Sequence, residues 1–184
     1  MDIKRLIKAC QENKRLAQKE LVAHIAPKLK GLCLRYLNDE FEVEEALQES
    51  LIKILKSINK YQLDKDSFFP WIKKITINTI FSRLKSQMRN PEMLRLETFA
   101  NKEVPPSVYD QLYSEDLLEL IHSLPLGYRT VLCLYAIDGY SHKEIAELLG
   151  INESSSRSQL TRARSLLKQK IISQKKDVRW KEIA

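Results

Sequence analysis

The side chains best suited to contact nucleic acid lie in one short segment in the last third of the chain. Six of them are short hydroxyls and arginines: Ser154, Ser155, Arg157, Ser158, Thr161 and Arg162. At about 100° per residue they share one side of a helix, opposite an apolar side made of Leu160, Ala163, Leu167 and Ile171. Such a face reaches phosphates and base edges in a major groove, and Arg157 and Arg162 are the strongest candidates. The alternative is a helical hairpin with a solvated polar face, which more often uses Glu and Lys pairs.

A turn in front of this segment predicts that it is the second helix of a helix-turn-helix. Ser141 and Glu144 have the spacing of a capping box, in which each side chain satisfies a backbone donor at a helix start. Gly150 suits the left-handed residue that ends a helix, and Asn152 suits the cap of the next one. A short helix, a tight turn and a longer helix form a helix-turn-helix.

The positive charge of the chain is concentrated at its C-terminal end. Residues 157–184 carry nine Lys or Arg and two Asp or Glu, a net charge of +7, which equals that of the whole chain. Lysine and arginine displace condensed counterions from nucleic acid, so this segment suits phosphate binding. Candidates for such nonspecific attraction are Lys168, Lys170, Lys175 and Lys176. A solvated basic tail that serves solubility explains the charge equally well.

The composition argues against several other classes of protein. The chain has no Gly-rich phosphate loop, nucleophile elbow or metal-ligand cluster, so we expect no enzyme, no metal and no cofactor. The chain contains no uninterrupted apolar run of about eighteen residues, so we expect no membrane-spanning helix. Its N-terminus lacks the pattern of a signal peptide, which predicts a cytoplasmic protein. The three cysteines, Cys10, Cys33 and Cys133, are odd in number and widely spaced, which fits neither a disulfide framework nor a metal-binding pair and indicates buried free thiols.

Hydrophobic periodicity predicts an all-α protein. Helical patterns cover 16–38, 42–58 and 71–88, although the β-branched run ITINTIF within the third would also permit a strand. Residues 61–70 are predicted to form a loop. A further helical block includes Leu117, Leu118 and Ile121, and Pro125 then opens a second helix, which ends at Gly139. We therefore predict two small helical domains joined by a linker. The ranges are a first domain at 1–90, a linker at 91–113 and a helix-turn-helix domain with a basic C-terminal tail at 114–184.

Four segments together resemble the extracytoplasmic-function group of RNA polymerase sigma factors. In the C-terminal half these are LPLGYRTVLCLYAIDGYS and EIAELLGINESSSRSQLTRARSLLK; in the N-terminal half they are EVEEALQESLIKIL and FFPWIKKITINTIFSRLK. The resemblance implies a transcription initiation factor that binds core RNA polymerase and promoter DNA. It implies that the first domain captures the minus-ten element and the second reads the minus-thirty-five element. An anti-sigma factor is a further partner that the resemblance implies.

The resemblance also implies roles for residues of the first domain. The polymerase-contacting helix matches Glu45, Gln48 and Glu49, for which a solvated acidic face is the alternative. The loop that accepts a flipped promoter base matches residues 61–67, with pocket groups from Tyr61, Gln62 and Asp64, and a nearby DNA-contacting position matches Asn78. An ordinary surface loop is the alternative there. The aromatic residues Phe68, Phe69 and Trp71 are expected to anchor the loop in the core.

The chain departs from the family pattern at a few positions. Ser156 stands where the family usually has Val, and a buried hydroxyl there needs a partner, such as the carbonyl four residues back. Ser50 and Leu51 depart from the aromatic version of the polymerase-contacting helix, and the last dozen residues lie beyond the resemblance. The main alternative function is a helix-turn-helix regulator that does not join polymerase, and a helical interaction protein with a basic tail is a second.

Overall fold

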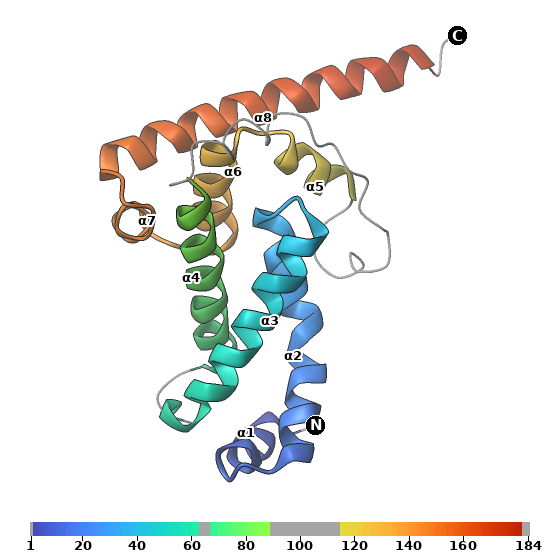
Figure 1. Cartoon of the computed structure of the whole chain (residues 1–184). Helices are drawn as coiled ribbons and strands as arrows, with labels where there is room; N and C mark the ends of the chain where they lie inside the picture. Colours follow the sequence, from blue (N-terminus) through green and yellow to red (C-terminus); the bar gives the residue numbers. More distant parts are fainter. Residues whose placement is uncertain (1, 63–66, 89–114, 182–184) are drawn as a thin grey trace. The chain divides into compact units, whose positions relative to one another are not determined.

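The computed structural model describes residues 2–62, 67–88 and 115–181, and of residues 85–88, 115–118 and 173–181 it describes the backbone alone. The chain divides into two compact units, Met1–Val108 and Tyr109–Ala184. Within the described ranges every regular element is a helix, so the all-α prediction is confirmed (Figure 1). No helix among the described residues is long and apolar enough to cross a membrane. The predicted linker at 91–113 lies outside the described residues.

The first unit is built on three helices that pack against one another. They are α2 (Arg15–Tyr36), α3 (Glu40–Ser57) and α4 (Phe68–Met88), and a 3-10 turn, η1 (Ile58–Lys60), follows α3 (Figure 1). Fully buried side chains at the centre include Leu21, Leu29, Ile54, Ile77 and Ile80. The helices predicted at 16–38 and 42–58 are therefore confirmed as α2 and α3.

Helix α4 resolves the conflict between the helical spacing and the β-branched run. Thr76 and Thr79 are buried, and their hydroxyls donate to the carbonyls of Ile72 and Ile75, both at 3.0 Å. These bonds satisfy the two hydroxyls within the helix, so helix is compatible with burial there. The helix begins at Phe68, so the expectation of a loop through residue 70 is wrong by three residues; Pro70 is tolerated because it lies in the first turn.

A helix that the periodicity did not predict precedes α2. Helix α1 (Ile3–Gln11) is capped by the Asp2 side chain, which accepts from the backbone N–H of Lys4. Its buried side chains are Leu6, Ile7 and Cys10, and it packs on α2. Asn13, at φ 59°, turns the chain between the two helices.

The described part of the second unit, residues 115–181, holds four α-helices and one π-helical segment. These are α5 (Glu115–His122), α6 (Leu126–Leu132), the π-helix η4 (Cys133–Ile137), α7 (His142–Leu149) and α8 (Glu153–Lys181). Its core joins Val131, Leu134, Ile145, Leu160 and Ala163, and α8 packs against both α6 and α7. The fold of this unit therefore holds α8 from two sides along its first turns.

The predicted turn chemistry of the helix-turn-helix is present. Ser141 and Glu144 form the capping box at the start of α7, and Gly150 ends α7 at φ 70°. The Asn152 side-chain oxygen then accepts from the backbone N–H of Ser155 at 2.7 Å, which caps α8. The three cysteines are free and buried, as predicted; burial raises the pKa of the Cys33 thiol to about 12, so it stays protonated at neutral pH.

Candidate nucleic-acid and protein interfaces

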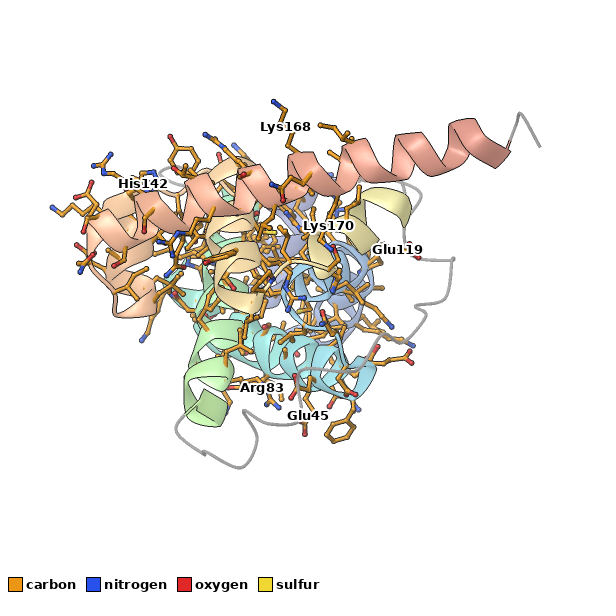
Figure 2. All side chains as sticks on the ribbon, turned by 90° about the horizontal axis from the view of Figure 1, so that it is seen from above. Glu45, Arg83, Glu119, His142, Lys168 and Lys170 are labelled. Atoms are coloured by element: carbon orange, nitrogen blue, oxygen red, sulfur yellow. The ribbon has the colours of Figure 1, made fainter. Side chains whose placement is uncertain are left out.

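The first turns of α8 present the polar face that the sequence predicted. Ser154, Arg157, Ser158, Thr161 and Arg162 are exposed, and Ser155 is half-buried. On the opposite side Leu160 and Ala163 are buried, whereas Leu167 and Ile171 are only half-buried. In the helix-turn-helix, the solvent-exposed side of α8 therefore consists of hydroxyl side chains and two arginines. Lys168 projects from the same helix further along (Figure 2).

The polar groups of this face are held only lightly. The Arg157 guanidinium pairs with Glu153 one turn earlier, and both side chains are largely exposed. Exposed pairs of this kind contribute about 0.2–1 kcal/mol, so a phosphate or base can displace Glu153. The hydroxyls of Ser158 and Thr161 donate to the carbonyls of Ser155 and Arg157, at 3.0 and 3.1 Å. Their oxygens can still accept from a donor such as an amino group of a base.

A hydrogen bond joins the two helices of the helix-turn-helix. Ser156 is fully buried, and its hydroxyl lies 2.9 Å from Nδ1 of His142 at the start of α7. The expectation that this hydroxyl bonds the carbonyl of Asn152 is therefore wrong, because a side chain of the other helix is within reach. The His142 ring stacks on Tyr135, with centroids 4.5 Å apart. The Arg164 guanidinium lies 5.7 Å from the centre of the Tyr135 ring. This cluster fixes the position of α8 relative to α7.

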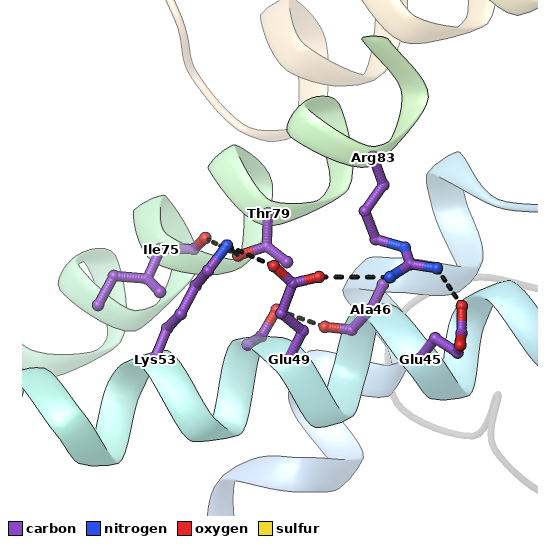
Figure 3. Close-up of polar contacts among 8 residues, drawn as sticks. Glu45, Ala46, Glu49, Lys53, Ile75, Thr79 and Arg83 are labelled. Atoms are coloured by element: carbon purple, nitrogen blue, oxygen red, sulfur yellow. Dashed lines mark hydrogen bonds and ion pairs between the residues drawn. The ribbon is translucent and has the colours of Figure 1, made fainter. Parts of the chain in front are cut away.

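In the first unit the three predicted polymerase-contacting residues lie on α3 in two environments. Gln48 is exposed, but Glu45 and Glu49 are half-buried beside α4, where both carboxylates bind the guanidinium of Arg83 (Figure 3). Lys53 binds the other oxygen of Glu49 at 2.7 Å. The Lys53 hydrogen bond, with Arg83 adding to it, holds the pKa of Glu49 below its ordinary value. Glu45 and Glu49 are therefore partly solvated and also ion-paired to α4.

The predicted base-binding loop begins from an aromatic cluster. Tyr61 is 6% exposed, and its ring contacts Phe68 and Trp71 at centroid distances of 5.3 and 5.0 Å. The carbonyls of Ile58 and Tyr61 both accept from the Gln11 side chain at 3.0 Å, so α1 holds the start of the loop.

The remaining predicted loop residues differ in their surroundings. Gln62 and Asn78 are exposed, and Asp64 lies outside the described residues. Phe68 and Trp71 pack against Tyr61 and against each other but are only half-buried, so they anchor the start of the loop without entering the core, and Phe69 does not join them. It is 45% exposed and lies beneath the ammonium of Lys28, 5.7 Å from the ring centre. The expectation that Phe69 is a core anchor is therefore wrong.

Two sequence families match the two units in the order of the chain. The family described as Sigma-70 region 2 matches residues 21–90, and Sigma-70 region 4 matches residues 114–167. The chain is 29% identical over 178 residues to the ECF RNA polymerase sigma-E factor of Haemophilus influenzae, covering 90% of this chain and 93% of that protein. It is 28% identical over 179 residues to that of Escherichia coli strain K12, covering 90% and 92%. This chain belongs to the extracytoplasmic-function group of sigma factors.

Two solved structures share the fold of this sigma factor. The sigma factor RpoE from Bartonella quintana, in complex with the anti-sigma factor NepR, matches with a TM-score of 0.56 and 18% identity. The match covers 82% of this chain and 94% of that one. CnrH, in complex with the cytosolic domain of CnrY, matches with a TM-score of 0.52 and 19% identity, covering 92% and 97%.

The surroundings of His142 predict a pH dependence for the region 4 unit of this sigma factor. Desolvation lowers the pKa of His142, and the charge of Arg157 lowers it further, against an opposing effect of Glu153. As the pH falls below the ordinary histidine pKa of about 6.5, His142 is therefore protonated in the unfolded chain before it is protonated in the folded one. Stability should be fully present above about pH 7 and decline as the pH falls through 6.5 towards the lowered pKa. Urea unfolding followed across this range measures the decline.

A matched variant isolates the contribution of His142. His142→Asn keeps a polar atom near the Ser156 hydroxyl but does not titrate, so its stability should vary less with pH over the same range. If both proteins lost stability in parallel, other groups would be responsible. A titration midpoint of the His142 ring at or above about 6.5, measured by NMR, would also contradict the prediction.

Three residues that position these interfaces were not identified from the sequence. They are Gln11, Arg83 and His142, and each acts on an element distant from its own in the chain. The sequence contains an indication only for His142, because the buried hydroxyl of Ser156 required a hydrogen-bond partner. For Gln11 and Arg83 the sequence gives no such requirement.

Proposed function

We propose that this sigma factor binds core RNA polymerase through the exposed side of α3 and directs it to promoters. In this proposal the polar face of α8 reads the minus-thirty-five element in the major groove. The region 2 unit captures the melted minus-ten element near Gln62 and Asn78. The observation that carries the proposal is the presentation of exposed hydroxyls and arginines by α8 in a capped helix-turn-helix.

The surfaces of the two units suit these different tasks. Arginine forms bidentate bonds with guanine, and short hydroxyls donate to or accept from either base or phosphate. On α3 the exposed Gln48 is flanked by Glu45 and Glu49, so this helix offers an amide and two carboxylates to a partner. Carboxylates repel phosphates, so this face suits a protein partner better than DNA.

A DNA-binding regulator without polymerase is the alternative, and it leaves the first unit without a role. The match of residues 21–90 to Sigma-70 region 2 supports the sigma reading over that alternative. We also propose that the protein has no catalytic activity of its own and acts in the cytoplasm, where core polymerase is found. Cell fractionation that recovers the chain outside the cytoplasmic fraction would contradict this location.

An anti-sigma factor is the second proposed partner. Two structural relatives were solved as complexes, one with the anti-sigma factor NepR and one with the cytosolic domain of CnrY. A protein of this kind would cover the polymerase-binding or DNA-binding face and keep the sigma factor inactive. Affinity purification of the chain from its native cells should recover such an inhibitor under non-inducing conditions. Recovery of polymerase alone under those conditions would contradict the proposal.

Reconstituted transcription tests the proposed function. We expect the purified chain, added to bacterial core polymerase on a pooled promoter library, to give discrete transcript starts that share two upstream motifs. Core polymerase alone is the control and should give no such starts. If the chain bound DNA but gave no defined starts with core polymerase from its own host, the regulator alternative would replace the sigma proposal.

A further inference from the structure

Arg83 connects the proposed polymerase-binding helix to a second helix. It lies on α4, and its two terminal nitrogens bind different carboxylates on α3. One binds Glu45, and the other lies 3.3 Å from Oε2 of Glu49 (Figure 3). The Arg83 side chain is 27% exposed, whereas those of Glu45 and Glu49 are 43% and 38% exposed. The carboxylates therefore stay accessible to a partner while the arginine holds them.

The arrangement opposes a repulsion within α3. Glu45 and Glu49 are four residues apart, so their like charges lie on the same side of the helix and repel each other. A guanidinium presents its donors in a rigid planar fork, which can bind two carboxylates at once. Lys53 also binds Glu49, at 2.7 Å, and donates to Thr79 of α4 at 3.2 Å. Glu49 is thus held by two cations from two helices.

A carboxylate held in this way remains able to accept more hydrogen bonds. Each carboxylate has about four acceptor positions, and the Arg83 bond occupies Oε2 of Glu45. A donor on the polymerase can therefore add to Glu45 without displacing Arg83. Because long side chains lose rotamer freedom on binding, carboxylates that are already ordered bind at a smaller entropic cost.

We infer that Arg83 is a positioning residue for polymerase binding: it orders Glu45 and Glu49 across the α3–α4 interface so that core RNA polymerase meets a fixed acidic pair. The inference rests on the proposed function, which assigns the polymerase contact to α3. Arg83 acts through the two carboxylates and need not touch the polymerase.

The test measures the dissociation constant of the full-length chain and immobilised core polymerase at physiological ionic strength. Arg83→Gln should weaken binding by about three- to tenfold, the equivalent of ordering one or two long side chains. Thermal unfolding of each variant shows whether the fold survives the change. Arg83→Gln should melt close to the unchanged chain, because partly exposed pairs contribute little to stability.

Lys30 supplies a matched control. It bridges α2 to Glu44 of α3, and its side chain is 27% exposed, as is that of Arg83. Lys30→Gln removes the same charge and one ion pair to the same helix, but it does not touch Glu45 or Glu49. We expect it to stay within about twofold of the unchanged chain. Comparing Arg83→Gln with Lys30→Gln controls for the loss of one positive charge beside α3.

A double-mutant cycle separates positioning from every other role. In a Glu45→Gln, Glu49→Gln background, Arg83→Gln should have no further effect on binding, because it has no carboxylates left to order. The same loss in both backgrounds, or no loss in the unchanged chain, would overturn the inference while the polymerase contact on α3 stands. If Glu45→Gln with Glu49→Gln did not weaken binding at all, the two carboxylates would not contact polymerase; this inference would fall, and the proposed contact on α3 would be left to Gln48.

Discussion

Replacing Arg157 by alanine should weaken promoter binding by the holoenzyme by about 1–3 kcal/mol, or about 5- to 150-fold, if its guanidinium reads a base in two bonds. Arg157 is exposed on the polar face of α8 and is held only by Glu153. The measurement compares binding to a promoter obtained from the library with binding to the same fragment scrambled at its upstream motif. The loss should appear on the promoter and be small on the scrambled fragment.

Two further variants of α8 fix the interpretation. Lys168→Ala should weaken binding to both fragments alike and lower the salt dependence by about one counterion, as expected of a phosphate contact. Glu153→Gln should change the affinity in the opposite direction and tighten promoter binding by up to about fivefold, because it releases Arg157 from its ion pair. Unchanged affinity of Arg157→Ala at physiological salt would remove Arg157 from the reading face. An equal loss on both fragments would make it a phosphate contact.

The elements that carry these interfaces were predictable because their signals are local. The capping box at Ser141 and the left-handed turn at Gly150 depend on residues within a few positions of each other. Helical spacing also predicted α4 correctly against the β-branched content of its centre. There the hydroxyls of Thr76 and Thr79 bond the backbone of their own helix, which no propensity scale includes.

The contacts between elements were not predictable, because they depend on how the helices are rotated and packed. Arg83 reaches a helix more than 30 residues earlier in the chain, and Gln11 reaches carbonyls about 50 residues later. A helical wheel places a residue on a side of its own helix, but it does not say which helix covers that side. The half-burial of Glu45 and Glu49 follows from the position of α4, so the sequence of α3 alone could not show it.

The aromatic residues around the predicted loop show the same limit. Tyr61 and Phe69 are both aromatic residues of the same predicted loop segment, yet Tyr61 is buried and Phe69 is 45% exposed. Helix α4 begins at Phe68, so Phe68, Phe69 and Trp71 all lie in its first turn. From that start Phe68 and Trp71 face the same side at a spacing of three residues, whereas Phe69 is rotated away by about 100°. The side of α4 on which each ring lies, rather than the residue type, decides which rings pack against Tyr61.

Replacing Ile145 by alanine should remove about 2–5 kcal/mol from the unfolding free energy of the region 4 unit. Ile145 is fully buried in α7, between the cap at Ser141 and the turn at Gly150. A unit of the length of Tyr109–Ala184 carries roughly 4–11 kcal/mol of stability, so the loss is a large share of the total. Hydrogen exchange read by mass spectrometry should show faster exchange across α6, α7 and α8. Exchange across α2, α3 and α4 should not change.

The reciprocal variant is Ile54→Ala, at a fully buried position of α3. It should speed exchange in the region 2 unit and spare the region 4 unit, because each side chain belongs to the core of its own unit. Ile172→Ala, at a position of α8 that is 46% exposed, should change neither unit by more than about 0.5 kcal/mol. Equal acceleration of both units by either core variant would mean that the chain unfolds as one cooperative body. With separate units, Ile145→Ala should lower promoter-specific initiation at elevated temperature while binding to core polymerase persists, because only the helix-turn-helix is weakened.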